Sequence, residues 1–81
     1  MAAIRGNKSE RAKQEKQFRE AVYGKMRVNG LSERRMGQRL GMSEATFHRR
    51  LQDPGEFRLH ELWRLAGEMD WTDADAGRYL F

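Results

Sequence analysis

Apolar residues recur along most of this chain at the three- and four-residue spacing of a helix face, not at the alternate spacing of a strand. Phe18, Val22 and Met26 are four residues apart and predict the buried stripe of a first helix over about residues 9–28. Residues 10–17 have only Ala12 to bury, so this part is expected to be either an exposed extension of the helix or disordered. Asn29-Gly30 follows directly and predicts the end of this helix.

The segment Leu31–Leu51 holds two shorter patterns separated by a glycine. Met36 and Leu40 are four residues apart, and Phe47 and Leu51 repeat that spacing one helix later. We therefore expect two short helices here, each with one face turned to the core.

The residues between these two patterns predict a tight turn. Gly41 stands where a helix commonly ends in a left-handed residue, and Ser43 stands where the next helix needs an N-cap. Gly37 supplies a small residue where the two helices would cross. This arrangement of two helices about a tight turn is typical of a helix-turn-helix over about residues 32–52.

The last third of the chain predicts two more helices. Asp53-Pro54-Gly55 is a turn signal, and a helix over about residues 58–69 follows it. The apolar residues expected on one face of that helix are Leu59, Leu62, Ala66 and Met69, with Trp63 and Leu65 flanking them. Thr72-Asp73-Ala74-Asp75 is typical of a capping arrangement and opens a short last helix.

Five helices with short connections and no strand pattern predict a compact all-α domain. We expect residues 1–8 to form a flexible basic arm and residues 9–81 to form a single domain. A chain of 81 residues buries roughly 60–65% of its unfolded surface, which provides one modest core and no separate catalytic cleft.

Composition narrows the classes of function. The chain has no cysteine, which excludes disulfides and thiolate metal sites and fits a cytoplasmic protein. No apolar run approaches the roughly 20 residues of a membrane span. His48 and His60 share no spacing that indicates a metal or a general base, and no nucleophile motif or phosphate-binding loop is present. We therefore expect that the protein is not an enzyme and that it binds no cofactor, metal ion or small-molecule ligand. We also expect no association with a membrane.

The charge is unevenly distributed. The net charge is +4, but residues 1–30 carry +5, residues 31–52 carry +3 and residues 53–81 carry −4. This asymmetry predicts an oriented electrostatic field and favours a nucleic-acid partner. The alternative is the ordinary unevenness of a small, highly charged protein.

The segment around the tight turn resembles the helix-turn-helix of the lambda-repressor and Cro-like DNA-binding family of phage and bacterial regulators. Gly37 matches the small residue at the helix crossing, Gly41 the turn glycine, and Met42 and Ser43 the apolar residue and serine after it. Phe47 matches the inward apolar position of the recognition helix. The resemblance runs from about residue 18 to the C-terminus.

Two positions depart from that family. A glutamine often opens the first of the two helices and bonds a phosphate, whereas this chain has Glu33. The inward position is usually aliphatic, so that Phe47 needs a larger pocket.

The resemblance implies which residues face a DNA groove. The base-contacting positions carried over from the family are Ser43, Glu44, Ala45, His48 and Arg49. The Arg49 fork matches guanine O6 and N7, Glu44 would accept from a cytosine amino group, and Ala45 would pack on a thymine methyl. The alternatives are a phosphate contact for Arg49 and stabilisation of the helix dipole for Glu44.

A second set of residues is expected to bind phosphates. Its members are Arg34, Arg35, Arg39, Thr46 and Arg50. The alternative for each arginine is a solvated surface position.

Four aromatic residues gather in the last third of the chain: Trp63, Trp71, Tyr79 and Phe81. They exceed what a five-helix core of this size must hold, and family members bind two-fold operators as dimers. We therefore expect these residues to form a homodimer interface. The alternative is that they complete the core of a monomer.

The sequence thus predicts a small phage-type transcriptional regulator, a repressor that binds a pseudo-palindromic operator in double-stranded DNA as a homodimer. A different class stays open, namely a protein-interaction module on the same fold, such as an antitoxin or an inhibitor. Its acidic fourth helix and terminal aromatics would then be the working surface.

Overall fold

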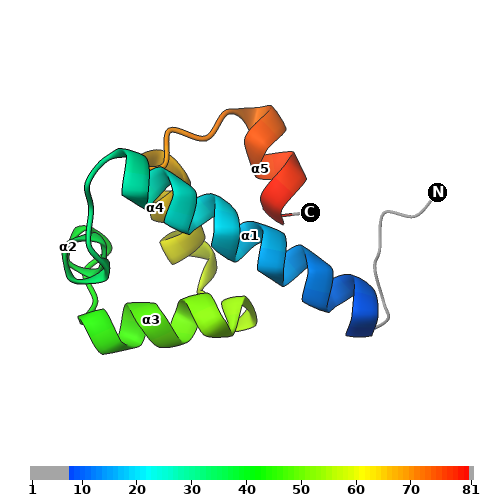
Figure 1. Cartoon of the computed structure of the whole chain (residues 1–81), viewed down its shortest axis with the longest axis horizontal. Helices are drawn as coiled ribbons and strands as arrows, with labels where there is room; N and C mark the ends of the chain where they lie inside the picture. Colours follow the sequence, from blue (N-terminus) through cyan, green and yellow to red (C-terminus); the bar gives the residue numbers. More distant parts are fainter. Residues whose placement is uncertain (1–7, 81) are drawn as a thin grey trace.

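Helices account for nearly all of the described part of the chain. The computed structural model describes residues 8–80, and it contains α1 (Lys8–Val28), α2 (Glu33–Arg39), α3 (Glu44–Gln52), α4 (Leu59–Glu68) and α5 (Asp73–Leu80), with a 3₁₀ turn η1 (Pro54–Glu56) (Figure 1). Residues 8–80 contain no strand, which confirms the predicted all-α class. The predicted N-terminal arm lies outside the described residues, except for Lys8, which begins α1.

The long helix α1 organises the molecule. It runs across the view in Figure 1, with α3 on one side, α5 on the other, α2 near its C-terminal end and α4 behind it. The whole measures 38 × 24 × 22 Å. No helix within residues 8–80 is both long enough and apolar enough to cross a membrane.

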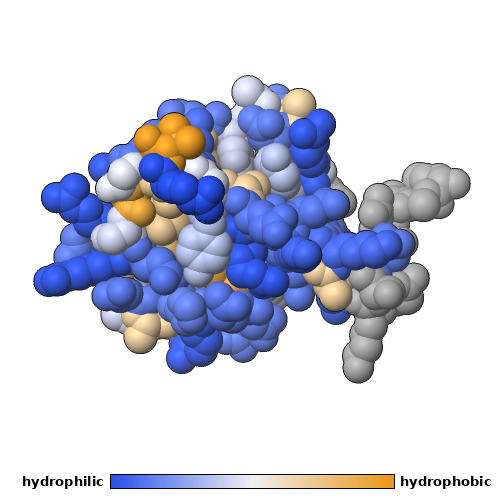
Figure 2. Space-filling model, in the orientation of Figure 1, coloured by the Kyte–Doolittle hydropathy of each residue, from blue (hydrophilic) through white to orange (hydrophobic). Residues whose placement is uncertain are grey.

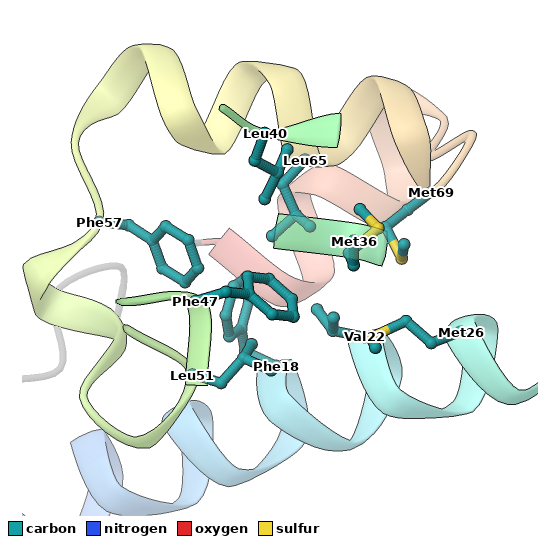
Figure 3. Packing of buried hydrophobic residues seen from close by; sticks show 10 residues of the cluster. All are labelled: Phe18, Val22, Met26, Met36, Leu40, Phe47, Leu51, Phe57, Leu65 and Met69. Atoms are coloured by element: carbon teal, nitrogen blue, oxygen red, sulfur yellow. The ribbon is translucent and has the colours of Figure 1, made fainter. Parts of the chain in front are cut away.

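One apolar core joins α1, α2, α3 and α4. Its buried residues are Phe18, Val22, Met26, Met36, Leu40, Phe47, Leu51, Phe57, Leu65 and Met69 (Figure 3). All four residues that the two short patterns placed inside are buried there, and so is the predicted stripe of α1. Burying each such side chain contributes about 1.5–3 kcal/mol, so this cluster holds α3 firmly against the other helices.

Helix α4 is rotated only in part from its predicted orientation, because Met69 is buried and Leu62 packs against the core as expected. Leu59 was expected in the buried stripe, but it is 61% exposed, whereas Leu65, expected at the flank, is fully buried. Glu61 is buried in the same helix. The reason is an ion pair between Glu61 and Arg50 of α3, which turns this face of α4 inward.

The start of α5 confirms the predicted capping arrangement. The Thr72 N–H donates to Asp75 Oδ2, and the Asp75 N–H donates to Thr72 Oγ1, each at 3.1 Å.

Two of the terminal aromatic residues, Trp71 and Tyr79, make ring contacts within their own chain. The Trp71 ring lies 6.0 Å from the Phe18 ring and 5.1 Å from the Tyr79 ring, centroid to centroid. These contacts favour the monomer-core alternative for Trp71 and Tyr79.

Candidate nucleic-acid interface

The junction between α2 and α3 is tight because two glycines permit it. A Cβ on Gly37 would lie 2.9 Å from the Met42 carbonyl oxygen and 3.1 Å from that of Ser43. Gly41 has φ +74°, a left-handed backbone conformation that residues other than glycine rarely adopt. The Met42 N–H donates to the Gly37 carbonyl at 2.9 Å and closes the turn.

Serine side chains begin both helices. Ser32 Oγ accepts from the Arg35 N–H, and Ser43 Oγ accepts from the Thr46 N–H, each at 3.1 Å. The Ser43 cap confirms the sequence prediction. Ser43 Oγ also donates to Thr46 Oγ1 at 3.0 Å, so that this hydroxyl pair is ordered before any ligand arrives.

The outward face of α3 gathers the predicted base-contacting residues. Glu44, Ala45, His48 and Arg49 are all exposed, and Ser43 is exposed just before them. Phe47 and Leu51, on the opposite face, are fully buried. The molecular face seen in Figure 2 is predominantly hydrophilic.

Arg49 is an exposed cation of this face. Its side chain is 65% exposed, and its Nε lies 3.8 Å from Glu56 Oε1, at the edge of the ion-pair range. An exposed pair at this distance contributes little to stability, so the guanidinium is able to exchange this partner for another anion.

Three helices meet through one carboxylate beside this face. Glu33 Oε2 accepts a hydrogen bond from the Tyr23 hydroxyl at 3.0 Å and lies 2.9 Å from His48 Nδ1. Burial and the hydrogen bond to this carboxylate raise the pKa of Tyr23 above its ordinary value of 10.0. The Tyr23 hydroxyl is therefore a donor at neutral pH.

The predicted phosphate ligands divide by their surroundings. Arg34 and Arg35 are exposed, and within residues 8–80 neither guanidinium has a carboxylate partner. Arg39 is also exposed, but its Nη1 donates to Glu68 Oε1 at 3.0 Å. Thr46 is half-buried and bonded to Ser43.

Arg50 differs from the rest of this set. Its Nη1 donates to Glu61 Oε1 at 2.6 Å and to Oε2 at 2.7 Å, and the two side chains are only 13% and 11% exposed. Both hydrogen bonds come from Nη1, and breaking a buried pair of this kind typically costs several kcal/mol. We therefore assign Arg50 the joining of α3 to α4, and its phosphate contact stays a prediction.

Glu61 is the residue of this region that the sequence prediction missed. Its Oε1 also accepts from the Arg58 N–H at 2.8 Å at the start of α4. Burial alone would raise the pKa of Glu61, but the Arg58 N–H and the Arg50 guanidinium outweigh it and hold that pKa below the ordinary 4.5. A glutamate three residues after a helix start was the available signal.

The predicted dimer residues have different surroundings. Trp71 and Tyr79 pack against the core, and Phe81 lies outside the described residues. Trp63 is 65% exposed on α4, one turn after the exposed Leu59. We call Leu59 and Trp63 the α4 apolar pair.

Comparisons of the chain with protein-family models, with curated proteins and with solved structures found no match.

Proposed function

We propose that this chain binds double-stranded DNA, with α2 and α3 acting as a helix-turn-helix whose second helix enters the major groove. The observation that carries the proposal is the division of α3 into two faces. The core fixes Phe47 and Leu51, while four polar or small side chains at groove-reading positions are exposed opposite them.

Each exposed side chain has a chemical role in this proposal. The Arg49 guanidinium donates to O6 and N7 of a guanine, after leaving its weak partner Glu56. Glu44 accepts from a cytosine amino group, and Ala45 packs against a thymine methyl. Ser43 contacts the edge of the site, and His48 reads a base one turn further along α3.

Phosphate contacts orient α3 without reading sequence. Arg34 and Arg35 are the primary phosphate ligands in this proposal. Both are exposed, and within residues 8–80 neither forms an ion pair that a phosphate would have to replace. Arg39 contacts a phosphate after exchanging its partner Glu68 for the phosphate, and Thr46 makes a weaker phosphate contact. The net charge of +3 over residues 31–52 supports this assignment.

A regulator is the biological role that we propose, specifically a phage-type repressor that occludes a promoter. One recognition helix contacts only a few base pairs, so discrimination requires a second copy on a pseudo-palindromic operator. The α4 apolar pair replaces the larger aromatic cluster as the proposed contact between two copies. Its small area predicts a weak dimer that DNA completes.

The proposal is tested by selecting bound duplexes from a random pool and then measuring affinity for the selected sequence. Arg49→Ala should weaken specific binding by about 1–3 kcal/mol and weaken non-specific binding less. The matched control is Arg78→Ala, which removes an exposed arginine of α5 and should change neither affinity. Equal losses in specific and non-specific binding would make Arg49 a phosphate ligand and contradict its assigned role.

One observation favours a second function. The α4 apolar pair lies in the acidic third of the chain, and such a surface suits a protein partner, as in an antitoxin or an inhibitor. A gel-shift with genomic fragments at two salt concentrations separates the two functions. Specific and non-specific DNA binding both weaken steeply with salt, whereas a protein-interaction module would retard no fragment at either concentration.

A further inference from the structure

The carboxylate of Glu33 links the core side of the molecule to the proposed DNA-reading face. Tyr23 of α1 donates to Glu33 Oε2 at 3.0 Å, and His48 Nδ1 of α3 lies 2.9 Å from the same oxygen. Glu33 is 26% exposed and His48 is 55% exposed, so the carboxylate is sheltered while the imidazole reaches solvent. The imidazole is therefore held at one nitrogen and open at the other.

The chemistry of this contact decides which imidazole nitrogen carries hydrogen. An ionised carboxylate only accepts hydrogen bonds, so Nδ1 must be the protonated nitrogen. In the neutral ring, Nε2 is then an acceptor, and it is the nitrogen left for a ligand. An acceptor in the major groove pairs with an amino group, N4 of cytosine or N6 of adenine. It does not pair with O6 or N7 of guanine, which are themselves acceptors.

We propose that Glu33 is a positioning residue that fixes the tautomer of His48, so that the neutral ring reads an amino-bearing base and rejects guanine on the strand it faces. This inference rests on the proposed function, because it requires α3 to lie in the major groove. It gives a purpose to a carboxylate placed among arginines, where a negative charge weakens attraction to phosphates.

The substitution Glu33→Gln separates the two effects of this carboxylate. The amide lacks the negative charge, so non-specific affinity for DNA should rise. It also offers both a donor and an acceptor to Nδ1, so it supports either tautomer of His48. We therefore expect a variant that binds DNA more tightly and reads the base opposite His48 less selectively.

The first test examines the free protein by ¹⁵N NMR of the imidazole, at a pH high enough that its signals no longer change. The wild type should carry hydrogen on Nδ1, and Glu33→Gln should shift the population toward hydrogen on Nε2. Tyr23→Phe is the matched control, because it removes the other donor to Glu33 and should leave the Nδ1–H form in place. A wild-type ring with hydrogen mainly on Nε2 would overturn the inference, whatever the DNA experiments give.

The second test repeats the duplex selection with the wild type, His48→Ala and Glu33→Gln. The base pair at which His48→Ala loses preference identifies the one that His48 reads. The wild type should prefer cytosine or adenine there on one strand, and Glu33→Gln should lower that preference several-fold while keeping the other positions.

The outcomes of the selection are distinguishable. Guanine at the His48 position, or a preference that Glu33→Gln leaves unchanged, overturns the inference and leaves the proposed function standing. A protein that selects no duplex overturns the proposed function, and the base-reading role of His48 falls with it.

Discussion

At the scale of single residues, the missing side chain of Gly37 determines how closely α2 approaches the chain that leads into α3. A methyl group there would meet two backbone carbonyl oxygens, those of Met42 and Ser43, and backbone cannot yield as a flexible side chain can. The position of α3 therefore depends on a residue that makes no contact with DNA in our proposal.

Substitution of Gly37 tests this dependence. Gly37→Ala should lower the free energy of unfolding by about 1–3 kcal/mol through overpacking. The matched control is Gly24→Ala within α1, where a Cβ meets nothing within 4 Å. That change should raise stability by about 0.5–1 kcal/mol, because alanine is the better helix former. Urea unfolding of both variants gives the comparison, and equal stability changes would show that the crossing is not tight.

At the scale of elements, the ion pair between Arg50 and Glu61 fixes α3 against α4. The pair is buried, and Glu61 also caps the first turn of α4 through the Arg58 N–H. One carboxylate thus sets both the start of α4 and its rotation about its own axis.

This carboxylate makes stability depend on pH in acid. The pKa of Glu61 is lower in the folded state than its ordinary value of 4.5, so the unfolded chain binds the proton more readily. The resulting stability is fully present above about pH 4.5 and is lost as the pH falls through the lower folded-state pKa. Urea unfolding measured from about pH 6 down to about pH 3 should show this decline.

A double substitution isolates the contribution of the pair. Arg50→Met combined with Glu61→Leu fills the space of the ion pair with apolar side chains and should keep the fold. Either change alone would leave a buried charged group without its partner. The double variant should show a flatter loss of stability in acid than the wild type. An unchanged acid dependence would mean that other carboxylates cause the decline.

The contrast between α3 and α4 shows how far the sequence predicts this fold. The spacing of Met36, Leu40, Phe47 and Leu51 predicted which faces of α2 and α3 are buried, because local periodicity alone decides them. The rotation of α4 was not predictable in this way. It depends on the long-range pair of Arg50 with Glu61, and a glutamate is ordinarily assigned to the surface.

The candidate site follows the same division. The exposed face of α3 was predictable because it lies opposite a clear apolar pattern. The internal partners of Arg39, His48 and Arg50 were not, since each lies on a different helix from its carboxylate. Side-chain pairs between helices depend on packing geometry that no spacing along one helix encodes.

At the scale of the whole molecule, the net charge differs between segments of the chain. The segment with α2 and α3 is basic, and the last third with α4 and α5 is acidic and bears the α4 apolar pair. The proposed two-fold dimer would use the exposed face of α3 on the duplex and the α4 apolar pair on the second copy. Such a dimer would place two copies of α3 one DNA turn apart, about 34 Å.

Substitution of the apolar pair tests the dimer. Trp63→Ser should lower the cooperativity of binding to the selected operator and convert a two-copy complex into a one-copy complex, without lowering the melting temperature. Val28→Ser is the matched control, because Val28 is also an exposed large hydrophobic residue but ends α1. Native mass spectrometry of the DNA complex gives the stoichiometry. A one-copy complex in the wild type would contradict the dimer.

The claim that α2 and α3 form the DNA-binding surface is tested most directly by NMR of the ¹⁵N-labelled protein with the selected duplex. The account predicts that the amide shifts concentrate at Glu44–Arg49 and at the start of α2, and that they diminish as salt is raised. Shifts concentrated on α4 and α5, or no shifts at any DNA concentration, would contradict it.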